Sequence, residues 1–240
     1  MALDLGVRIT WLGHATFLLT GPDGETVLVD PFVASNPSCP EKLRSFARLD
    51  VIAITHGHLD HMADAAQIYQ QHQPVVVAIV EVAAWLRGQG IPQDAVTEMN
   101  KGGTVRVGDV EITMVDANHS AGIVDGDRIL YGGEPAGLIF TFSNGTRVYH
   151  AGDTNVFSDM RLIGELYHPD VALLPIGDHY TMGPFEAAKA CELLGVPRVV
   201  PMHYGTWPIL VGTPAELRQE CAKRGVHVEV MALEPGDTLE

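Results

Sequence analysis

The sequence predicts an α/β fold in which two β-sheets pack face to face and helices cover their outer faces. Three observations support this. Short β-rich runs alternate with helical patterns, this alternation occurs in both halves of the chain, and no long linker or low-complexity segment interrupts it. Strands occur both as hairpins and singly between helices, so each sheet should be mixed. Because both sheets look apolar on two faces, helices must cover the outside. We expect one domain over residues 1–240.

The first half begins with three short strands separated by glycine-containing turns. The turn at residues 21–24 reads GPDG, in which proline fixes φ and glycine tolerates positive φ. A buried strand, a helix, a second buried strand, a short helix and a third strand follow. The expected strands span residues 8–13, 16–21, 26–30, 51–55, 74–80 and 110–117, and the expected helices span 62–71 and 82–87.

The second half repeats this order and adds clear helix ends. Pro184 begins one helix and Gly195 ends it, while Thr213 caps the next helix before Pro214. The expected strands lie in residues 138–142, 146–152, 171–176, 198–203 and 227–233, and the expected helices span 156–167, 184–194 and 214–224.

Composition restricts the functional classes. The formal charge is −15, which argues against a protein that binds nucleic acid through phosphate contacts. The first residues lack a basic stretch followed by a long apolar one, so we expect no signal peptide. The longest apolar run, residues 75–80, is far below the roughly 20 residues that cross a bilayer. The three cysteines form no CxxC pair, which favours a reduced, soluble, cytoplasmic protein with no membrane association.

The stretch ITHGHLDH, residues 54–61, holds three histidines and one aspartate directly after an apolar run. His56 and His58 are two residues apart, so in an extended segment they point to one side. Asp60 and His61 follow where the chain turns into a helix, so they project elsewhere. One short loop can therefore supply two metal positions. Imidazole and carboxylate ligands suit zinc, manganese or iron.

Further histidines and aspartates follow other strands. His119, Asp153 and His203 each come just after an apolar strand, at the sheet edge where loops converge. A lone buried histidine is usually only hydrogen-bonded in place, and we interpret His72, His168 and His227 in that way. His150 lies inside a strand and is interpreted as a core residue or a partner of a ligand. A structural zinc site would favour cysteine ligands, so this cluster fits an open two-metal site better.

These motifs resemble the metallo-β-lactamase superfamily. The segments THGHLDH, WLGHATFLL, VDPF, NPSCP, ANHS, AGDT, PIGDHYTMGP and PMHYGTWP resemble one branch of it, the uncharacterised predicted metal-dependent hydrolases close to the L-ascorbate-6-phosphate lactonases. N-acyl-phosphatidylethanolamine-hydrolysing phospholipase D is a more distant relative with a similar GHAT start. The resemblance covers essentially the whole chain and implies a four-layer αββα sandwich, but it does not specify a substrate.

The resemblance also implies the roles of the metal ligands. One ion would be held by His56, His58 and His119, and a second by Asp60, His61 and His203, with Asp153 bridging the two. The ions would be zinc or manganese, with iron and nickel as alternatives. A shared water would then attack a carbonyl carbon or a phosphorus atom. Asp60 would orient that water and carry a proton to the leaving group.

For other residues near these motifs, a functional and a structural interpretation are both open. Asp30 and His14 are candidates to support the ligands, because a metal-bound histidine usually needs a carboxylate partner; both are also ordinary turn residues. His179 could donate a hydrogen bond to an oxyanion and Asp178 could orient it, although this segment could simply cap a helix. Tyr180, in the same segment, has the same two interpretations, and Trp207 could form the wall of a pocket or lie in the core. Cys39 is expected in an exposed loop and is not interpreted as a nucleophile.

The leading function is a hydrolase of a small-molecule ester, lactone or phosphoester, whose substrate could be anionic. The alternative is a phosphodiesterase of the phospholipase D or nuclease type, which the acidic charge and the lack of an apolar anchor disfavour. A di-iron redox protein usually has glutamate where this chain has His58, and a non-enzymatic remnant would not keep a full ligand set. Related folds often assemble, which favours a homo-oligomer.

Overall fold

A computed structural model describes residues 5–240. The first four residues lie outside the described part. They include part of the stretch that argued against a signal peptide, and they belong to the predicted domain of residues 1–240, which stays a prediction. None of the helices in residues 5–240 combines the length and apolar character needed to cross a bilayer.

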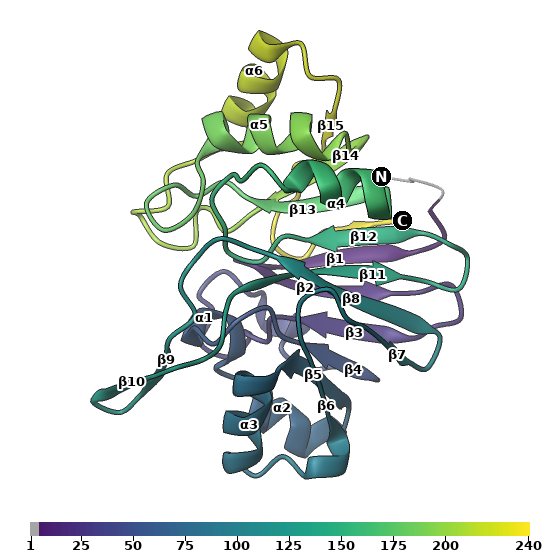
Figure 1. Cartoon of the computed structure of the whole chain (residues 1–240), viewed down its shortest axis with the longest axis vertical. Helices are drawn as coiled ribbons and strands as arrows, with labels where there is room; N and C mark the ends of the chain where they lie inside the picture. The colour runs from purple at the N-terminus through teal and green to yellow at the C-terminus, as the bar shows by residue number, and fades with distance from the viewer. Residues whose placement is uncertain (1–4) are drawn as a thin grey trace.

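Two mixed β-sheets form the centre of the molecule, as predicted (Figure 1). In each sheet, antiparallel strands on one side continue into parallel strands on the other. The first sheet has the order β16-β1-β2-β3-β4-β5-β6, with bounds Thr238–Leu239, Arg8–Gly13, Thr16–Thr20, Thr26–Val29, Val51–Ala53, Val75–Ile79 and Val96–Met99. The second has the order β15-β14-β13-β12-β11-β8-β7, with bounds Glu229–Val230, Arg198–Met202, Val171–Pro175, Arg147–His150, Ala136–Thr141, Val110–Asp116 and Thr104–Val107.

Helices cover the outer faces, which confirms the predicted layer order. Figure 1 shows α4, α5 and α6 beside the second sheet and α2 and α3 beside the first. The helices are α1 Leu59–Met62, α2 Ala65–His72, α3 Val80–Gly88, α4 Met160–Tyr167, α5 Pro184–Leu194 and α6 Pro214–Arg224, with 3₁₀ turns at Glu41–Leu43 and Gln93–Ala95. Thr213 caps α6 as expected, and the cap is a capping box: the Glu216 amide donates to Thr213 Oγ1 and the Glu216 carboxylate accepts from the Thr213 amide.

The alternation of β13 shows how one strand serves two layers. Val171 and Leu173 pack into the core between the sheets, whereas Ala172 and Leu174 pack against the helices outside. All four are fully buried. A strand with two covered faces therefore becomes a continuous apolar run, because successive side chains point to opposite faces.

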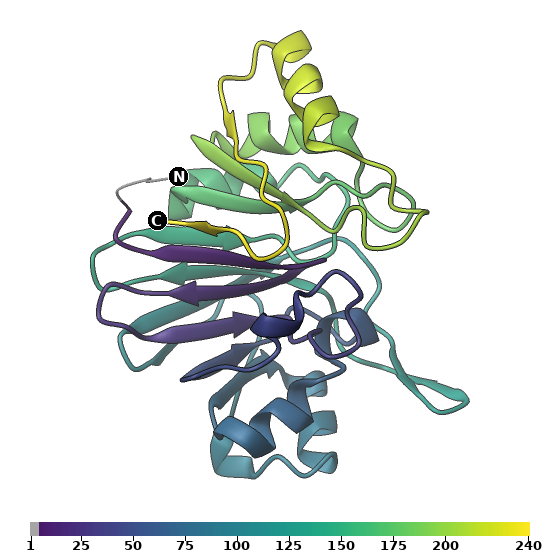
Figure 2. The same cartoon turned by 180° about the vertical axis from the view of Figure 1, so that it is seen from behind.

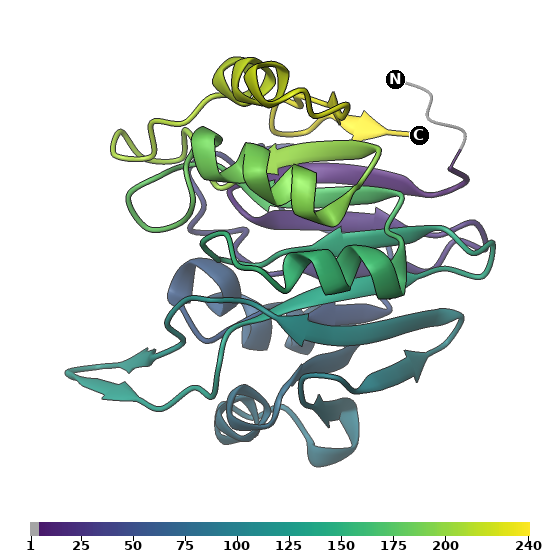
Figure 3. The same ribbon diagram turned by 45° about the horizontal axis from the view of Figure 1, so that its top comes forward.

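Several elements differ from the sequence-based expectation. Strands β6, β7 and β16 were not predicted, and the helix expected over residues 156–167 begins only at Met160. The helix expected over residues 62–71 is divided into α1 and α2, because the Asp64 carboxylate accepts hydrogen bonds from the amides of Val33 and Ala34 at 2.6 and 2.8 Å. The strand expected over 227–233 is only β15, since Glu229 and Val230 alone pair with β14. The segment taken as a loop after His119 contains the hairpin of β9 (Ile123–Asp125) and β10 (Arg128–Leu130), which projects from the body in Figures 2 and 3.

Candidate metal centre

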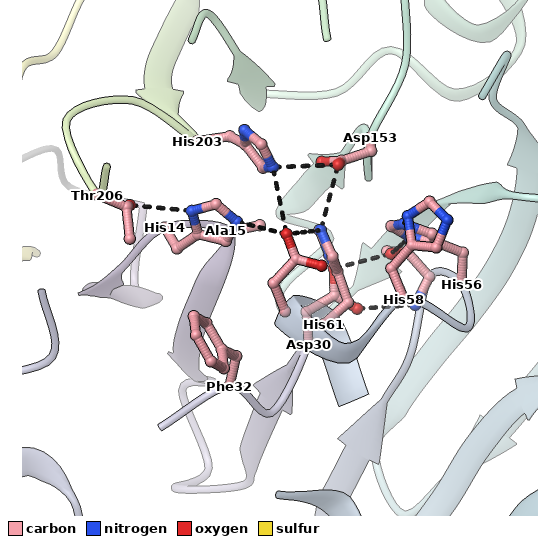
Figure 4. Close-up of polar contacts among 12 residues, drawn as sticks. His14, Ala15, Asp30, Phe32, His56, His58, His61, Asp153, His203 and Thr206 are labelled. Carbon is pink, nitrogen blue, oxygen red and sulfur yellow. Dashed lines mark hydrogen bonds and ion pairs between the residues drawn. The ribbon is translucent and has the colours of Figure 1, made fainter. Parts of the chain in front are cut away.

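The candidate site lies where the strands of both sheets end, as the sequence predicted. His56 and His58 follow β4, and Asp60 and His61 belong to the single turn of α1. From the second sheet, His119 follows β8, Asp153 follows β12 and His203 follows β14. The sheets thus hold the ends of several separate loops against one another, and residues far apart in the chain meet at one place (Figure 4).

The structure groups these side chains into neighbouring donor sets. The donor atoms within each set lie within 4.8 Å of one another. The first set is His56, His58 and His119; the second is His14, Asp60, His61 and His203; and Asp153 forms a third with His56 and His61. Every ligand predicted from the sequence therefore lies in a set that could hold a metal ion.

Asp153 lies between the first and the second donor set. Its Oδ2 atom is 3.1 Å from His203 Nε2 and 3.3 Å from His61 Nε2 on one side, and 3.7 Å from His119 Nε2 on the other. The residue is almost fully buried. A carboxylate in this position can contact ions held by either set.

Several of these atoms have no hydrogen-bond partner, although they are buried. They are His61 Nε2, both ring nitrogens of His203 and Asp153 Oδ1. The His61–Asp153 approach at 3.3 Å is a close ion pair, but its geometry does not make a hydrogen bond. Buried polar atoms are normally paired, and unpaired ones cost free energy. Together with a donor set of imidazoles and carboxylates, these atoms fit a divalent cation.

The charges around His61 support the same conclusion. Burial alone would lower the pKa of His61, but the carboxylates of Asp153, Asp30 and Asp60 together raise it well above its usual value. Burial acts to raise the pKa of Asp153, yet His203 and His61 hold it well below its usual range. The pocket therefore strongly favours positive charge, which a bound cation would supply.

The three histidine rings of the first donor set are uncharged at neutral pH. Complete burial lowers the pKa of His56 well below its usual value, and partial burial lowers the pKa values of His58 and His119. The neutral imidazole is the form that binds metal. These three rings are therefore available as ligands at neutral pH.

Asp30 is the carboxylate partner that the sequence suggested. Its Oδ2 lies 2.7 Å from His61 Nδ1 and accepts a 2.8 Å hydrogen bond from Thr55 Oγ1, while its Oδ1 accepts from the Thr55 amide. Thr55 Oγ1 is also 3.0 Å from His56 Nδ1. Asp30 thus fixes the ring of His61 so that Nε2 faces the site, and it reaches His56 through Thr55.

His14 lies closer to the centre than its sequence position alone indicated. It is fully buried, with Nε2 3.1 Å from Asp60 Oδ2 and Nδ1 2.9 Å from Thr206 Oγ1. Burial lowers its pKa to about 4. Burial acts to raise the pKa of Asp60, but His61 and His14 hold it well below its usual range. His14 therefore either orients Asp60 or joins the second donor set itself.

Unusual backbone angles accompany the site. His14, Asp30 and His203 have φ values of 57°, 50° and 56°, a region that non-glycine residues seldom occupy. Asp178 and His179 share this conformation at 62° and 57°. Such strain gathers where a side chain must be aimed at a fixed point. No sequence pattern signals it, apart from the general tolerance of aspartate for positive φ.

The structure places His179 at the surface and Cys39 in the interior. The side chain of His179 is exposed and packs edge-on against the Tyr180 ring, with centroids 4.4 Å apart. Tyr180 lines the cavity beside the metal ligands. The role of His179 as an oxyanion donor stays a prediction. Cys39 was expected to be exposed, and this is wrong: it is 3% exposed, and burial raises its pKa.

A cavity of about 770 Å³ opens onto the donor sets. His58, Asp60, His119 and Asp153 are among the residues that line it. Ser120, which the sequence analysis did not single out, lines the same cavity and lies 3.3 Å from His58 Nε2 through its hydroxyl. A small substrate can therefore reach the candidate metal centre directly from solvent.

Comparisons with known proteins agree with this geometry. The model of the beta-lactamase superfamily domain matches residues 25–204. The chain is 51% identical over 98% of its length to a UPF0173 metal-dependent hydrolase of Koribacter versatilis, covering 99% of that protein. It is 53% identical over 98% of its length to one of Rubrobacter xylanophilus, covering 96% of that protein. Igni18, a metallo hydrolase of Ignicoccus hospitalis, superposes with a TM-score of 0.84 at 36% identity, with 97% of each chain covered.

Proposed function

Since this chain is a metal-dependent hydrolase that belongs to the beta-lactamase superfamily and, within it, to the UPF0173 group, we propose that it cleaves an ester, lactone or phosphoester of a small molecule with a water activated by two metal ions. The observation that carries this proposal is the position of Asp153 between two donor sets. One ion would use His56, His58 and His119.

The second ion would use Asp60, His61 and His203, again with Asp153. When bound, the two ions lower the pKa of a shared water towards neutrality and offset the negative charge that develops on the electrophile. Zinc and manganese are the ions we expect, and iron or nickel would fit the same donor chemistry.

The chain's own residues supply the remaining functions. Asp30 holds His61 with Nε2 towards the site. Asp60 lies in the cavity wall, where it can accept a proton from the attacking water and pass it to the leaving group. His14 keeps Asp60 ionised by the contact at 3.1 Å. His179, on the loop after β13, is our candidate to contact the oxyanion.

The test is hydrolysis by protein stripped with a chelator and reloaded separately with zinc or manganese. A model lactone and bis(p-nitrophenyl) phosphate serve as substrates, metal content is measured in parallel, and Asp60→Ala is the blank. Two ions per chain and lactone turnover well above the blank are expected. Phosphodiester turnover alone would favour the alternative phosphodiesterase function. One ion per chain in a fully active enzyme would contradict the two-metal mechanism.

A further inference from the structure

We propose that this site takes uncharged carboxylic esters or lactones that carry an apolar chain on the acyl side, and that the apolar part of the cavity lining binds that chain. This inference rests on the proposed hydrolase function. In the reaction, the water oxygen bonds to the carbonyl carbon, the bond from that carbon to the leaving oxygen breaks, and one water proton passes to the leaving alkoxide. An ester gives an alcohol and a carboxylic acid, and a lactone gives a single hydroxy acid.

The residues that line the cavity differ in chemistry. Metal ligands and two serines make up part of the lining, and the rest is a set of six apolar and aromatic side chains, the apolar wall: Phe32, Leu59, Ala63, Tyr180, Trp207 and Ile209. Ligand sites commonly combine an apolar lining with a few polar groups that orient the reacting part. Here the polar groups are concentrated at the candidate metal centre, so the apolar part of a bound molecule must extend away from it.

Residues of the apolar wall are fixed by contacts with the residues of the candidate metal centre. The ring of Trp207 packs edge-on against His14, with centroids 4.8 Å apart, and lies 6.2 Å from the ring of Phe32. Thr206, next to Trp207, contacts His14 Nδ1 at 2.9 Å. The loop that carries Phe32 is fixed by the Asp64 carboxylate. The wall is therefore held in place before any ligand binds, which lowers the entropy cost of binding.

Large apolar side chains stay in water at the opening of this cavity. Leu59 is 47% exposed, Tyr180 56% and Ile209 43%. Single exposed apolar residues are common, but these three come from separate segments of the chain and line one cavity. Covering them removes apolar surface from water, which favours binding in proportion to the area covered. The acyl chain of a substrate bound at the metal centre would extend over these three side chains and cover them.

The charges of the cavity disfavour an anionic substrate. Of the described residues that line it, none is lysine or arginine, while Asp60 and Asp153 are carboxylates. The chain as a whole has a formal charge of −15. A phosphate or carboxylate placed along the apolar wall would find no cationic side chain to offset its desolvation. The sequence left an anionic substrate open, and the cavity favours an uncharged one.

The first experiment measures kcat/KM for the p-nitrophenyl esters of acetate, butyrate, hexanoate and octanoate with metal-loaded protein. We expect kcat/KM to rise about threefold to fourfold for each added methylene until the chain fills the wall. Ile209→Ala should flatten this dependence. Val211→Ala is the matched control, because Val211 is 62% exposed nearby but does not line the cavity. A flat series in the wild-type protein, or equal flattening by both variants, would overturn the proposal.

The second experiment needs no turnover. Metal-free protein is titrated with butanamide, hexanamide and octanamide, and binding is followed by the fluorescence of Trp207, with Trp207→Phe to identify the signal. Affinity should rise with chain length by a similar factor, and hexyl phosphate and hexanoate should bind more weakly than hexanamide. Length-dependent binding without hydrolysis would support the apolar wall and refute the proposed function. Hydrolysis with tighter binding of the anions would refute the apolar wall alone.

Discussion

The contact between Asp30 and His61 gives the sharpest test of how the site is held. In Asp30→Asn, the amide oxygen can still accept from the Thr55 amide, but an NH₂ group replaces Oδ2. That group cannot accept the proton of His61 Nδ1 at 2.7 Å or that of Thr55 Oγ1 at 2.8 Å. The tautomer of His61 with its proton on Nε2 then becomes the more stable one, because Nδ1 can accept a hydrogen bond from the new NH₂ group. A protonated Nε2 cannot bind a metal ion.

The expected loss is 10-fold to 100-fold in affinity for the ion held by the second donor set, or about 1.4 to 2.8 kcal/mol. The first donor set should keep its affinity, because its contact with Asp30 passes only through Thr55. Asparagine tolerates positive φ well, so the backbone angle of 50° adds little to the effect. Competition between the protein and a fluorescent chelator measures the two affinities separately.

Asp50→Asn is the matched control. Asp50 accepts hydrogen bonds from the amide and hydroxyl of Thr26 at the opposite end of β3, away from the site. It should bind both ions like the wild-type protein, and thermal unfolding should show both variants folded. The reasoning fails if folded Asp30→Asn binds both ions with unchanged affinity, or if Asp50→Asn loses as much affinity as Asp30→Asn.

Four further predictions follow from the site. Asp60→Ala should lose one metal ion and turnover together, and a fully metallated, active variant would contradict its assignment. His179→Ala should lower kcat about 10²-fold to 10³-fold with metal content unchanged if it contacts the oxyanion; a kcat equal to that of the wild-type protein would remove it from the mechanism. The pKa of His14 is about 4 in the folded chain and about 6.5 in the unfolded chain, so the unfolded state takes up a proton first as pH falls. Metal-free protein should therefore lose stability between pH 6.5 and 4, and His14→Gln should reduce that slope in thermal unfolding. Finally, metal at 100 times its dissociation constant should add about 2.7 kcal/mol, and an unchanged Tm on chelation would show that the donor sets bind no ion in the folded state.

The sequence predicted the architecture because its signals are local and repeated. Apolar runs such as Val171–Pro175 are short and bounded by turns, and Thr213, Pro214 and Gly195 mark helix ends directly. The boundaries that failed depend on distant contacts. Asp64 divides a helical pattern only because it binds the amides of Val33 and Ala34, about thirty residues earlier in the chain.

The metal ligands of the candidate site were predictable from the sequence, but much of what surrounds them was not. Histidines and aspartates after strand ends are visible in the sequence, and the structure brings them together. The depth of His14 was not predictable, because a histidine after a glycine reads equally well as a turn. The full apolar wall was not predictable. The sequence offered Trp207 alone as a pocket wall, and Phe32 and Trp207 follow strands of different sheets and meet only in the folded chain.

The distribution of the donors along the chain has a consequence for synthesis. His56 and His58 leave the ribosome long before His119, Asp153 and His203, and each donor set or bridge joins loops of different sheets. The emerging chain therefore cannot assemble either complete binding position until β8, and then β12 and β14, have formed and packed against the first sheet. The chain can therefore bind metal ions at full affinity only after both sheets have packed. Metal binding stabilises the folded protein, but it does not direct the first steps of folding.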